Sequence, residues 1–238
     1  MENSCLKKYK PSPKKWILAS RYSEFRRNPA LIPANAGLFH YAGNNPVRYI
    51  DPDGRAEILL RGTEADKKSL CRFINKYSID RFIISPDGNR LVKDGNKKNG
   101  FLGIGKSKTY SESINKVFAS DSIISVNLYL GNDYTKVNPN VTNRDDIRKK
   151  SNGGITVPYP DGHIDVMISP DGGEKIEYTD GTSKNYKSPQ EVMMHEIVGH
   201  VEPICSGQNG NAVDKENKCR GEANLKQRKQ EPYHDCFN

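Results

Sequence analysis

The chain has 238 residues, a hydrophobic fraction of 34% and a formal net charge of +8 at pH 7. This length allows one ordinary domain with a small appendage, and the hydrophobic fraction is low but sufficient for a globular core. No apolar run approaches the roughly 18 residues of a transmembrane helix, and "WILA" is too short to serve as the core of a signal peptide. We therefore expect no membrane partner.

The excess of positive charge lies mainly at the front of the chain. Residues 1–54 contain nine Lys/Arg and four Asp/Glu, whereas residues 55–238 carry a net charge of only +3. This distribution argues against nucleic acid as the partner of the main domain. We interpret residues 1–20 as a basic N-terminal tail.

The stretch "GLFHYAGNNPVRYIDPDGR", residues 37–55, is an extended segment that bears tyrosines and is followed by turns. It resembles the end of the RHS repeat-associated core, whose last repeats read "YxYxxNNPxxxxDPxG", and the resemblance covers about residues 21–55. It implies that residues 56–238 form a toxin or effector domain, secreted or delivered to a target cell, with a cognate immunity protein as partner. The alternative is a turn-rich linker.

The residues that follow are predicted to form mostly strands. The pattern predicts a strand at 56–62, a capped amphipathic helix at 63–78, a hairpin at 81–95, a helix at 111–120, a strand at 122–130, a long loop at 132–154 and two or three strands within 155–182. With helices at the end of the chain, this order predicts an α+β fold: a small, mostly antiparallel sheet with two C-terminal helices.

The first of these helices has a strong start signal. Ser188 is a suitable N-cap, Pro189 follows at the first helical position, and Glu191 completes a capping box. We expect the helix to continue through "EVMMHEIVGHV" and to end before Pro203. A second helix is predicted at 211–230, with Asn211 as its cap.

Two histidines on the first helix stand five residues apart. On a regular helix His195 and His200 would lie about 140° apart around the axis, whereas residues four apart differ by about 40°. A single π-type turn would bring both onto one face, and Gly199 lowers the steric cost of that turn. The alternative is an ordinary helix whose histidines serve different faces.

The sequence "HEIVGH" resembles the HExxGH helix of dipeptidyl peptidase III, and also metallopeptidase-like toxin domains found behind RHS cores. The resemblance implies a zincin-like site in which His195 and His200 bind Zn²⁺ and Glu196 is the base that activates the metal-bound water. Neutral imidazoles suit zinc and leave a position for water. The implied activity is that of a zinc-dependent peptidase effector acting on a protein or peptide substrate.

Such a site needs a third ligand from downstream, and the candidates are Asp214, Glu216, Glu222 and His234. The segment "AVDKENKCR" resembles an "ENxxR" helix that follows the histidine helix in RHS-linked peptidase toxins, which implies that Glu216 is the ligand. Arg220 lies four residues later and is placed to orient that carboxylate. Glu222 is the reserve ligand, and His234 is interpreted as a tail residue or a late acid/base partner.

Several features keep a structural interpretation beside the functional one. His163 is expected to be a packed or exposed strand residue, and Tyr233 is a candidate for oxyanion stabilisation. Cys205 and Cys219 are either a disulfide or a pair of free thiols. Two alternative functions stay open: a nuclease toxin domain, and an inactive orphan RHS fragment.

Overall fold

The computed structural model describes residues 57–100, 103–128, 144–232, 234 and 236. The chain divides into two units, Met1–Pro52 and Asp53–Asn238, and every described residue belongs to the second. The predicted tail at 1–20 and the RHS-like segment at 21–55 lie outside the described residues. No helix in the described part is long and apolar enough to cross a membrane.

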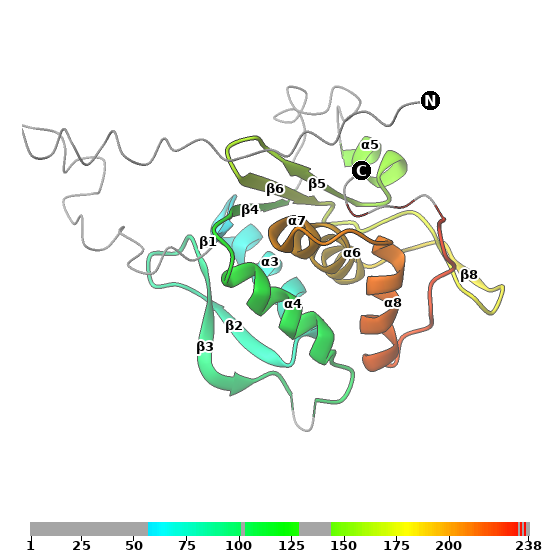
Figure 1. Cartoon of the computed structure of the whole chain (residues 1–238), viewed down its shortest axis with the longest axis horizontal. Helices are drawn as coiled ribbons and strands as arrows, with labels where there is room; N and C mark the ends of the chain where they lie inside the picture. Colours follow the sequence, from blue (N-terminus) through cyan, green and yellow to red (C-terminus); the bar gives the residue numbers. More distant parts are fainter. Residues whose placement is uncertain (1–56, 101–102, 129–143, 233, 235, 237–238) are drawn as a thin grey trace, which may run out of the picture. The chain divides into compact units, whose positions relative to one another are not determined.

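The central sheet has four strands in the order β1-β4-β6-β5 (Figure 1). Their bounds are β1 Glu57–Leu60, β4 Ile123–Leu128, β6 His163–Ile168 and β5 Gly154–Pro158. The pairs β1–β4 and β4–β6 are parallel, and only the pair β5–β6 is antiparallel. The expectation of a mostly antiparallel sheet is therefore wrong for this sheet. The long connections between β1 and β4 and between β4 and β6 allow each later strand to run in the direction of the earlier one.

The remaining strands form two small antiparallel hairpins. One joins β2 (Asp80–Ile84) to β3 (Leu91–Lys98), as predicted, and the other joins β7 (Ile176–Glu177) to β8 (Ser183–Lys184). The described domain is thus a mixed α/β structure with small antiparallel sheets, which confirms the α+β expectation in its coarse form.

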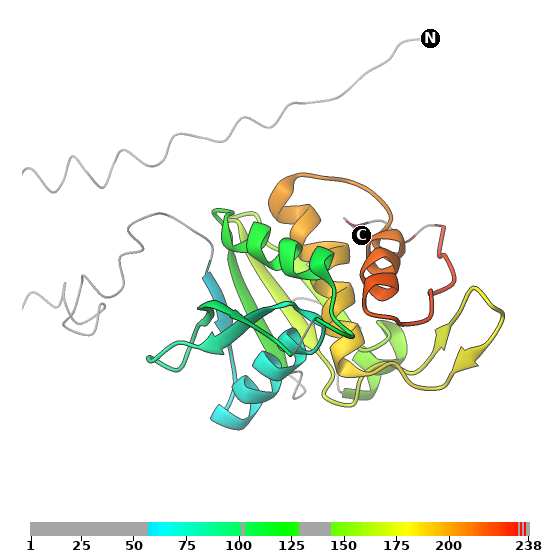
Figure 2. The ribbon, with the colours of Figure 1, turned by 90° about the horizontal axis from the view of Figure 1, so that it is seen from below.

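All but one of the helices of the described part pack together on one face of the central sheet. Their bounds are α3 Glu64–Tyr77, α4 Lys108–Phe118, α6 Pro189–Glu196, the π-helix η4 Ile197–Val201, α7 Glu202–Ser206 and α8 Ala212–Glu222. The continuous run α6–η4–α7 lies between α3 and α4 (Figure 2). A further helix, α5 (Arg144–Lys150), packs against β5.

Alternation along β6 explains how both faces of the sheet are covered. Ile164, Val166 and Ile168 belong to the main core with the helix layer, whereas Met167 packs with Ile147 of α5 in a second cluster. Successive side chains of a strand point to opposite faces, so one strand serves both clusters. This arrangement places the C-terminal end of α5 near the edge strand β5.

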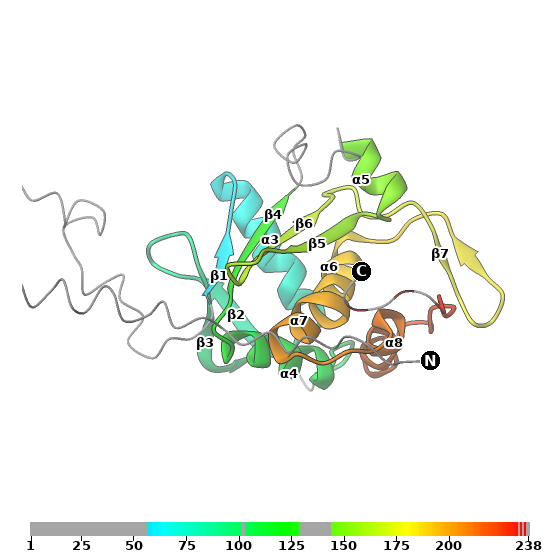
Figure 3. The same cartoon turned by 45° about the horizontal axis from the view of Figure 1, so that its top comes forward.

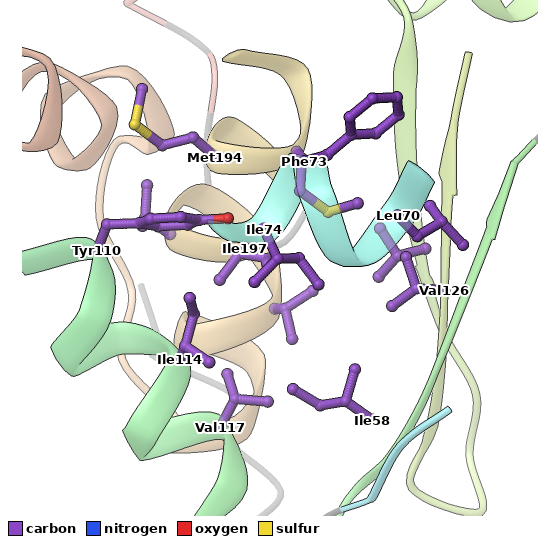
Figure 4. Close-up of a cluster of buried hydrophobic side chains, with 14 of the residues drawn as sticks. Ile58, Leu70, Phe73, Ile74, Tyr110, Ile114, Val117, Val126, Met194 and Ile197 are labelled. Carbon is purple, nitrogen blue, oxygen red and sulfur yellow. The ribbon is translucent and has the colours of Figure 1, made fainter. Parts of the chain in front are cut away.

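The main core fixes the rotation of the histidine helix. Met194 and Ile197 pack among side chains of α3, α4 and the sheet, such as Ile74, Tyr110 and Ile58 (Figure 4). All five are buried, and a buried side chain of this size stabilises the fold by roughly 1.5–3 kcal/mol. Because these residues anchor one side of the helix, the side chains between them are turned toward the cleft described below.

The capping residues expected from the sequence mark the starts of α6, α3 and α8 correctly. The Ser188 side chain accepts from the Glu191 amide and the Glu191 carboxylate accepts from the Ser188 amide, which is the predicted capping box. The same reciprocal pair joins Thr63 and Asp66 at the start of α3. Asn211 caps α8 as expected.

Both helix ends differ from the prediction. The helical run continues through Pro203 to Ser206. Pro203 has no amide hydrogen to donate, and it follows directly after the π-turn, where the regular i→i−4 pattern is already interrupted. The second helix ends at Glu222 rather than near residue 230. Asn224 has φ 57°, and the Leu225 amide donates to the Arg220 carbonyl at 2.8 Å, the pattern of a left-handed helix end. The chain after Asn224 is thereby freed to fold back.

Among the described residues no disulfide is present, and Cys205 and Cys219 both carry free thiols. Burial raises the pKa of the Cys219 thiol to about 12, with smaller contributions from neighbouring groups. This thiol is therefore a core residue and not a reactive nucleophile.

Candidate metal centre

A π-turn interrupts the histidine helix at the predicted place. The segment Ile197–Val201 is a π-helix, and the Glu202 amide donates to the Ile197 carbonyl five residues earlier. As a result the rings of His195 and His200 lie on one side, with centroids 5.1 Å apart. The prediction of a π-type turn is confirmed.

Gly199 has a second role that the sequence did not indicate. A Cβ atom at this position would lie only 2.9 Å from the Cβ of Ala212, at the start of α8. The glycine therefore allows α8 to approach the histidine helix closely, besides easing the π-turn.

His234 joins the two helix histidines. Its Nε2 atom lies 3.2 Å from Nε2 of His195 and 3.3 Å from Nε2 of His200. The ligand nitrogens of all three residues lie within 4.8 Å of one another, and this group can hold a metal ion. The interpretation of His234 as a tail residue is wrong, because the segment that follows α8 folds back across the end of the histidine helix.

The outer nitrogen of each ring lies beside an oxygen atom. A carbonyl or carboxylate only accepts hydrogen bonds, so these contacts favour the proton on Nδ1 and, in a neutral ring, a lone pair on Nε2. The three contacts are His195 Nδ1 with Glu216 Oε2 at 2.8 Å, His200 Nδ1 with the Cys236 carbonyl at 3.0 Å, and His234 Nδ1 with Glu231 Oε2 at 2.7 Å.

When all three rings are neutral with the proton on Nδ1, the three Nε2 lone pairs converge and repel one another, and a cation among them removes that repulsion. Two nitrogens bound to one tetrahedral zinc at the usual 2.0–2.1 Å lie about 3.3 Å apart. The observed Nε2–Nε2 separations of 3.2 and 3.3 Å match this value. The donor set and these two separations therefore fit a metal ion such as zinc held by the three imidazoles.

Glu216, the expected third ligand, does not belong to the group of side chains that can hold the metal ion. Its fully buried carboxylate contacts the outer nitrogen of His195, accepts from Arg220 at 3.2 Å and from Arg228 at 2.9 Å, and lies 3.9 Å from Lys187 Nζ. The predicted Glu216–Arg220 pair is thus present. Its position makes Glu216 a support for the His195 ring, in the arrangement that commonly orients metal-binding histidines.

The electrostatics of this network keep His195 neutral. Burial, and then the nearby charge of Lys187, lower the pKa of His195 well below its ordinary value. Burial alone would raise the pKa of Glu216, but Lys187, His195 and Arg228 hold it well below its ordinary value. Neutral imidazole beside a charged carboxylate is the state that binds a metal.

The proposed base Glu196 lies on the same helix and contacts the edge strand β5. Thr156 donates from Oγ1 to Glu196 Oε2 at 2.7 Å, and a Cβ atom at Gly154 would lie 2.4 Å from Glu196 Oε1. Strand β5 therefore both holds the carboxylate and leaves room for it. Figure 3 shows β5 beside α6, with α8 on the other side of the helix.

A cleft of about 990 Å³ brings Glu196 and the three histidines together. Residues of β5, of the C-terminal end of α5 and of the segment after α8 form its walls. The volume lies at the upper end of the range typical of ligand sites.

Other candidates have structural partners elsewhere. The reserve ligand Glu222 accepts from the hydroxyl and amide of Thr109 at 2.6 and 2.8 Å, and so caps α4. Asp214 pairs with Gln230. His163 contacts Ser125 and Asp165 at 3.0 and 3.1 Å. None of these three candidates faces the histidine cluster, and Tyr233 lies outside the described residues.

Sequence reasoning missed Lys187 and preferred Glu216 to His234 as the third ligand. Only its residue type marked His234 as a candidate, since nothing in "EPYHDC" indicates that the segment returns to the helix. Lys187 is 2% exposed and lines the cleft, yet in the sequence it is only the residue before the helix cap. Its burial arises from contacts with segments distant in the sequence.

Comparison with known proteins adds no relative to these observations. The chain matches no family model, no curated protein and no solved structure.

Proposed function

We propose that the chain is a zinc-dependent peptidase. The observation that carries this proposal is the convergence of the Nε2 atoms of His195, His200 and His234 beside the carboxylate of Glu196 in one cleft. Three imidazoles without an oxygen ligand favour zinc over magnesium or calcium. A carboxylate next to a three-histidine site supports hydrolysis.

The residues of the chain have separate tasks in this proposal. His195, His200 and His234 would hold the zinc ion, which when bound would supply Lewis-acid chemistry and would lower the pKa of a bound water molecule to about 7. Glu196 accepts the proton of the attacking water on Oε1, because Oε2 is already occupied by the Thr156 hydroxyl. The same carboxylate then passes the proton to the leaving amine. Glu216 and Glu231 keep the rings of His195 and His234 in the tautomer that binds metal.

The proposed biological role is that of an effector or toxin delivered to a target cell and neutralised by a cognate immunity protein. This part rests on the resemblance of residues 21–55 to the end of an RHS core. The substrate would then be a protein of the target cell.

The first experiment is zinc stoichiometry by elemental analysis. We expect about one zinc per chain in wild type and in Glu196→Gln, and none in His195→Ala, His200→Ala or His234→Ala. His163→Ala is the matched control, since His163 contacts Ser125 and Asp165 and does not line the cleft. Hydrolysis of a mixed peptide library should follow the zinc content, except that Glu196→Gln binds zinc without cleaving.

The outcomes separate the proposals. A wild type that takes up no zinc under loading conditions would refute the metal centre. Zinc retained by His234→Ala would show that the site closes without this residue. Zinc without peptide hydrolysis, together with cleavage of nucleic acid, would favour the nuclease alternative, and zinc without any hydrolysis would favour the inactive fragment.

A further inference from the structure

The charges that line the cleft are strongly unequal. Among the described lining residues, six are lysines or arginines and three are glutamates. Two of these glutamates have tasks at the metal centre, since Glu196 is the proposed base and Glu231 supports His234. The lining therefore carries three more cationic side chains than glutamates.

The inner cations are engaged with the buried network. Arg228 pairs with Glu216 at 2.9 Å and also with Glu231, and Lys187 lies 3.9 Å from Glu216. Their charge serves to hold these carboxylates, and this use is structural.

The outer cations form a lysine rim, which we define as Lys149, Lys150, Lys175 and Lys229. One carboxylate, Glu177, lies among them, and it is shared between Lys175 at 2.7 Å and Lys229 at 3.4 Å. Lys149 is exposed at the C-terminal end of α5. Two of the rim lysines thus share one glutamate, and all four line the cleft.

The rim is assembled from three parts of the chain. Lys149 and Lys150 end α5, and Lys175 precedes β7. Lys229 belongs to the segment after α8, and its backbone amide donates to the Glu177 carbonyl at 2.8 Å. Charges of one sign around a concave site focus the field and concentrate ligands of the opposite sign there. The lysines are therefore placed to attract an acidic ligand toward the metal centre.

The uncharged lining indicates which kind of acidic ligand fits. Ile155, Ile176 and Pro232 line the cleft, and among the described lining residues there is no phenylalanine, tyrosine or tryptophan. Proteins that bind single-stranded nucleic acid stack bases on such aromatic rings. Aliphatic surface between lysines suits the backbone and side chains of a peptide better.

We propose that the cleft selects peptides that carry aspartate or glutamate close to the scissile bond, with the lysine rim as the specificity-determining surface. This inference rests on the proposed peptidase function and names its substrate class. Each solvent-exposed contact between a rim lysine and an acidic side chain contributes little binding free energy by itself, so the preference arises from several lysines together.

The test separates binding from cleavage. Zinc-loaded Glu196→Gln protein is titrated with two labelled peptides of the same length, one with acidic and one with lysine residues around a common central sequence, and binding is followed by fluorescence anisotropy. We expect the acidic peptide to bind at least about fivefold more tightly at low salt, with the ratio shrinking as salt is raised. Wild type should cleave the acidic peptide with the higher kcat/KM.

Charge reversal identifies the surface. Lys149→Glu combined with Lys229→Glu should remove or invert the preference while the zinc content stays at one per chain. Lys68→Glu is the matched control, because Lys68 is exposed on α3 and does not line the cleft.

An unchanged preference in the double variant, or equal binding of both peptides by the parent protein, would overturn the inference even if peptide hydrolysis is observed. Selective binding of the acidic peptide without cleavage in wild type would refute the peptidase function and leave the charge selectivity standing. Preferential binding of a nucleic acid over both peptides would overturn the choice of ligand class.

Discussion

Nδ1 of His195 lies 2.8 Å from Oε2 of Glu216, on the side of the ring opposite to the nitrogen that faces the other histidines. The carboxylate is in turn held by Arg220, which also contacts Glu191 of the capping box at 3.0 Å. A continuous set of contacts therefore links the start of the histidine helix, α8 and the metal centre. Through it the Glu216 carboxylate restrains the orientation of the His195 ring.

This relationship predicts that Glu216→Gln weakens zinc binding without abolishing it. Loss of a carboxylate that supports a metal-binding histidine typically costs 10–100-fold in metal affinity. Competition with a chromophoric chelator measures this affinity. Glu222→Gln is the control, because Glu222 contacts Ser107 and Thr109 instead. A Glu216→Gln protein that binds no zinc even at saturation would instead make Glu216 a direct ligand.

Thr156 positions the proposed base. Removing its hydrogen bond to Glu196 with Thr156→Val should lower kcat/KM by roughly 10–100-fold, because a hydrogen bond to a charged group contributes about 1.5–3 kcal/mol. Zinc content should not change. Thr156→Ser retains the hydroxyl and should restore most of the activity. Equal activity of the valine and serine variants would show that the hydroxyl does not act on Glu196.

The contact between Gly199 and Ala212 predicts a compensating pair of substitutions. Gly199→Ala introduces a Cβ atom 2.9 Å from that of Ala212, and such overpacking costs about 1–3 kcal/mol. Ala212→Gly removes the opposing atom. The double variant should therefore lose less free energy of unfolding than the sum of the losses in the two single variants. Denaturant unfolding of the four proteins measures this coupling. Simple additivity would contradict the close approach of α8.

The contacts of Asp80 predict that the folded state loses stability at low pH. It pairs with Lys93 at 2.9 Å and with Lys98, and accepts from Asn115 at 2.8 Å. Burial raises its pKa, but these partners outweigh burial and lower it to about 2. Because the folded pKa lies below that of the unfolded chain, the carboxylate stabilises the fold above about pH 4 and loses this effect as the pH falls toward 2.

The corresponding measurement compares wild type with Asp80→Asn by urea unfolding at pH 5 and pH 3. The advantage of wild type should be about 2 kcal/mol at pH 5 and clearly smaller at pH 3. An advantage that does not depend on pH would show that the Asp80 contacts act through packing and not through charge.

The sequence alone determined the features that arise within a few residues of one another. Ser188 with Glu191 and Thr63 with Asp66 are separated by three residues, so their caps form from local contacts. The five-residue spacing of His195 and His200 is also local: together with the resemblance of "HEIVGH" to an HExxGH helix it leads to the expectation of a π-turn, which the structure contains. The pairing of His195 with His200 in one site could therefore be predicted, whereas the contribution of His234 could not.

The tertiary structure decided the rest. His234 reaches the cluster only because α8 ends at Glu222 and the chain turns back at Asn224, and no local pattern encodes that path. The role of Glu216 depends on Arg228 and Lys187, and the lysine rim joins residues from α5, the approach to β7 and the C-terminal segment. The parallel pairing of β1 with β4 is equally long-range. Such contacts form because many segments bury their apolar surfaces together, and that balance cannot be read from any single stretch of the chain.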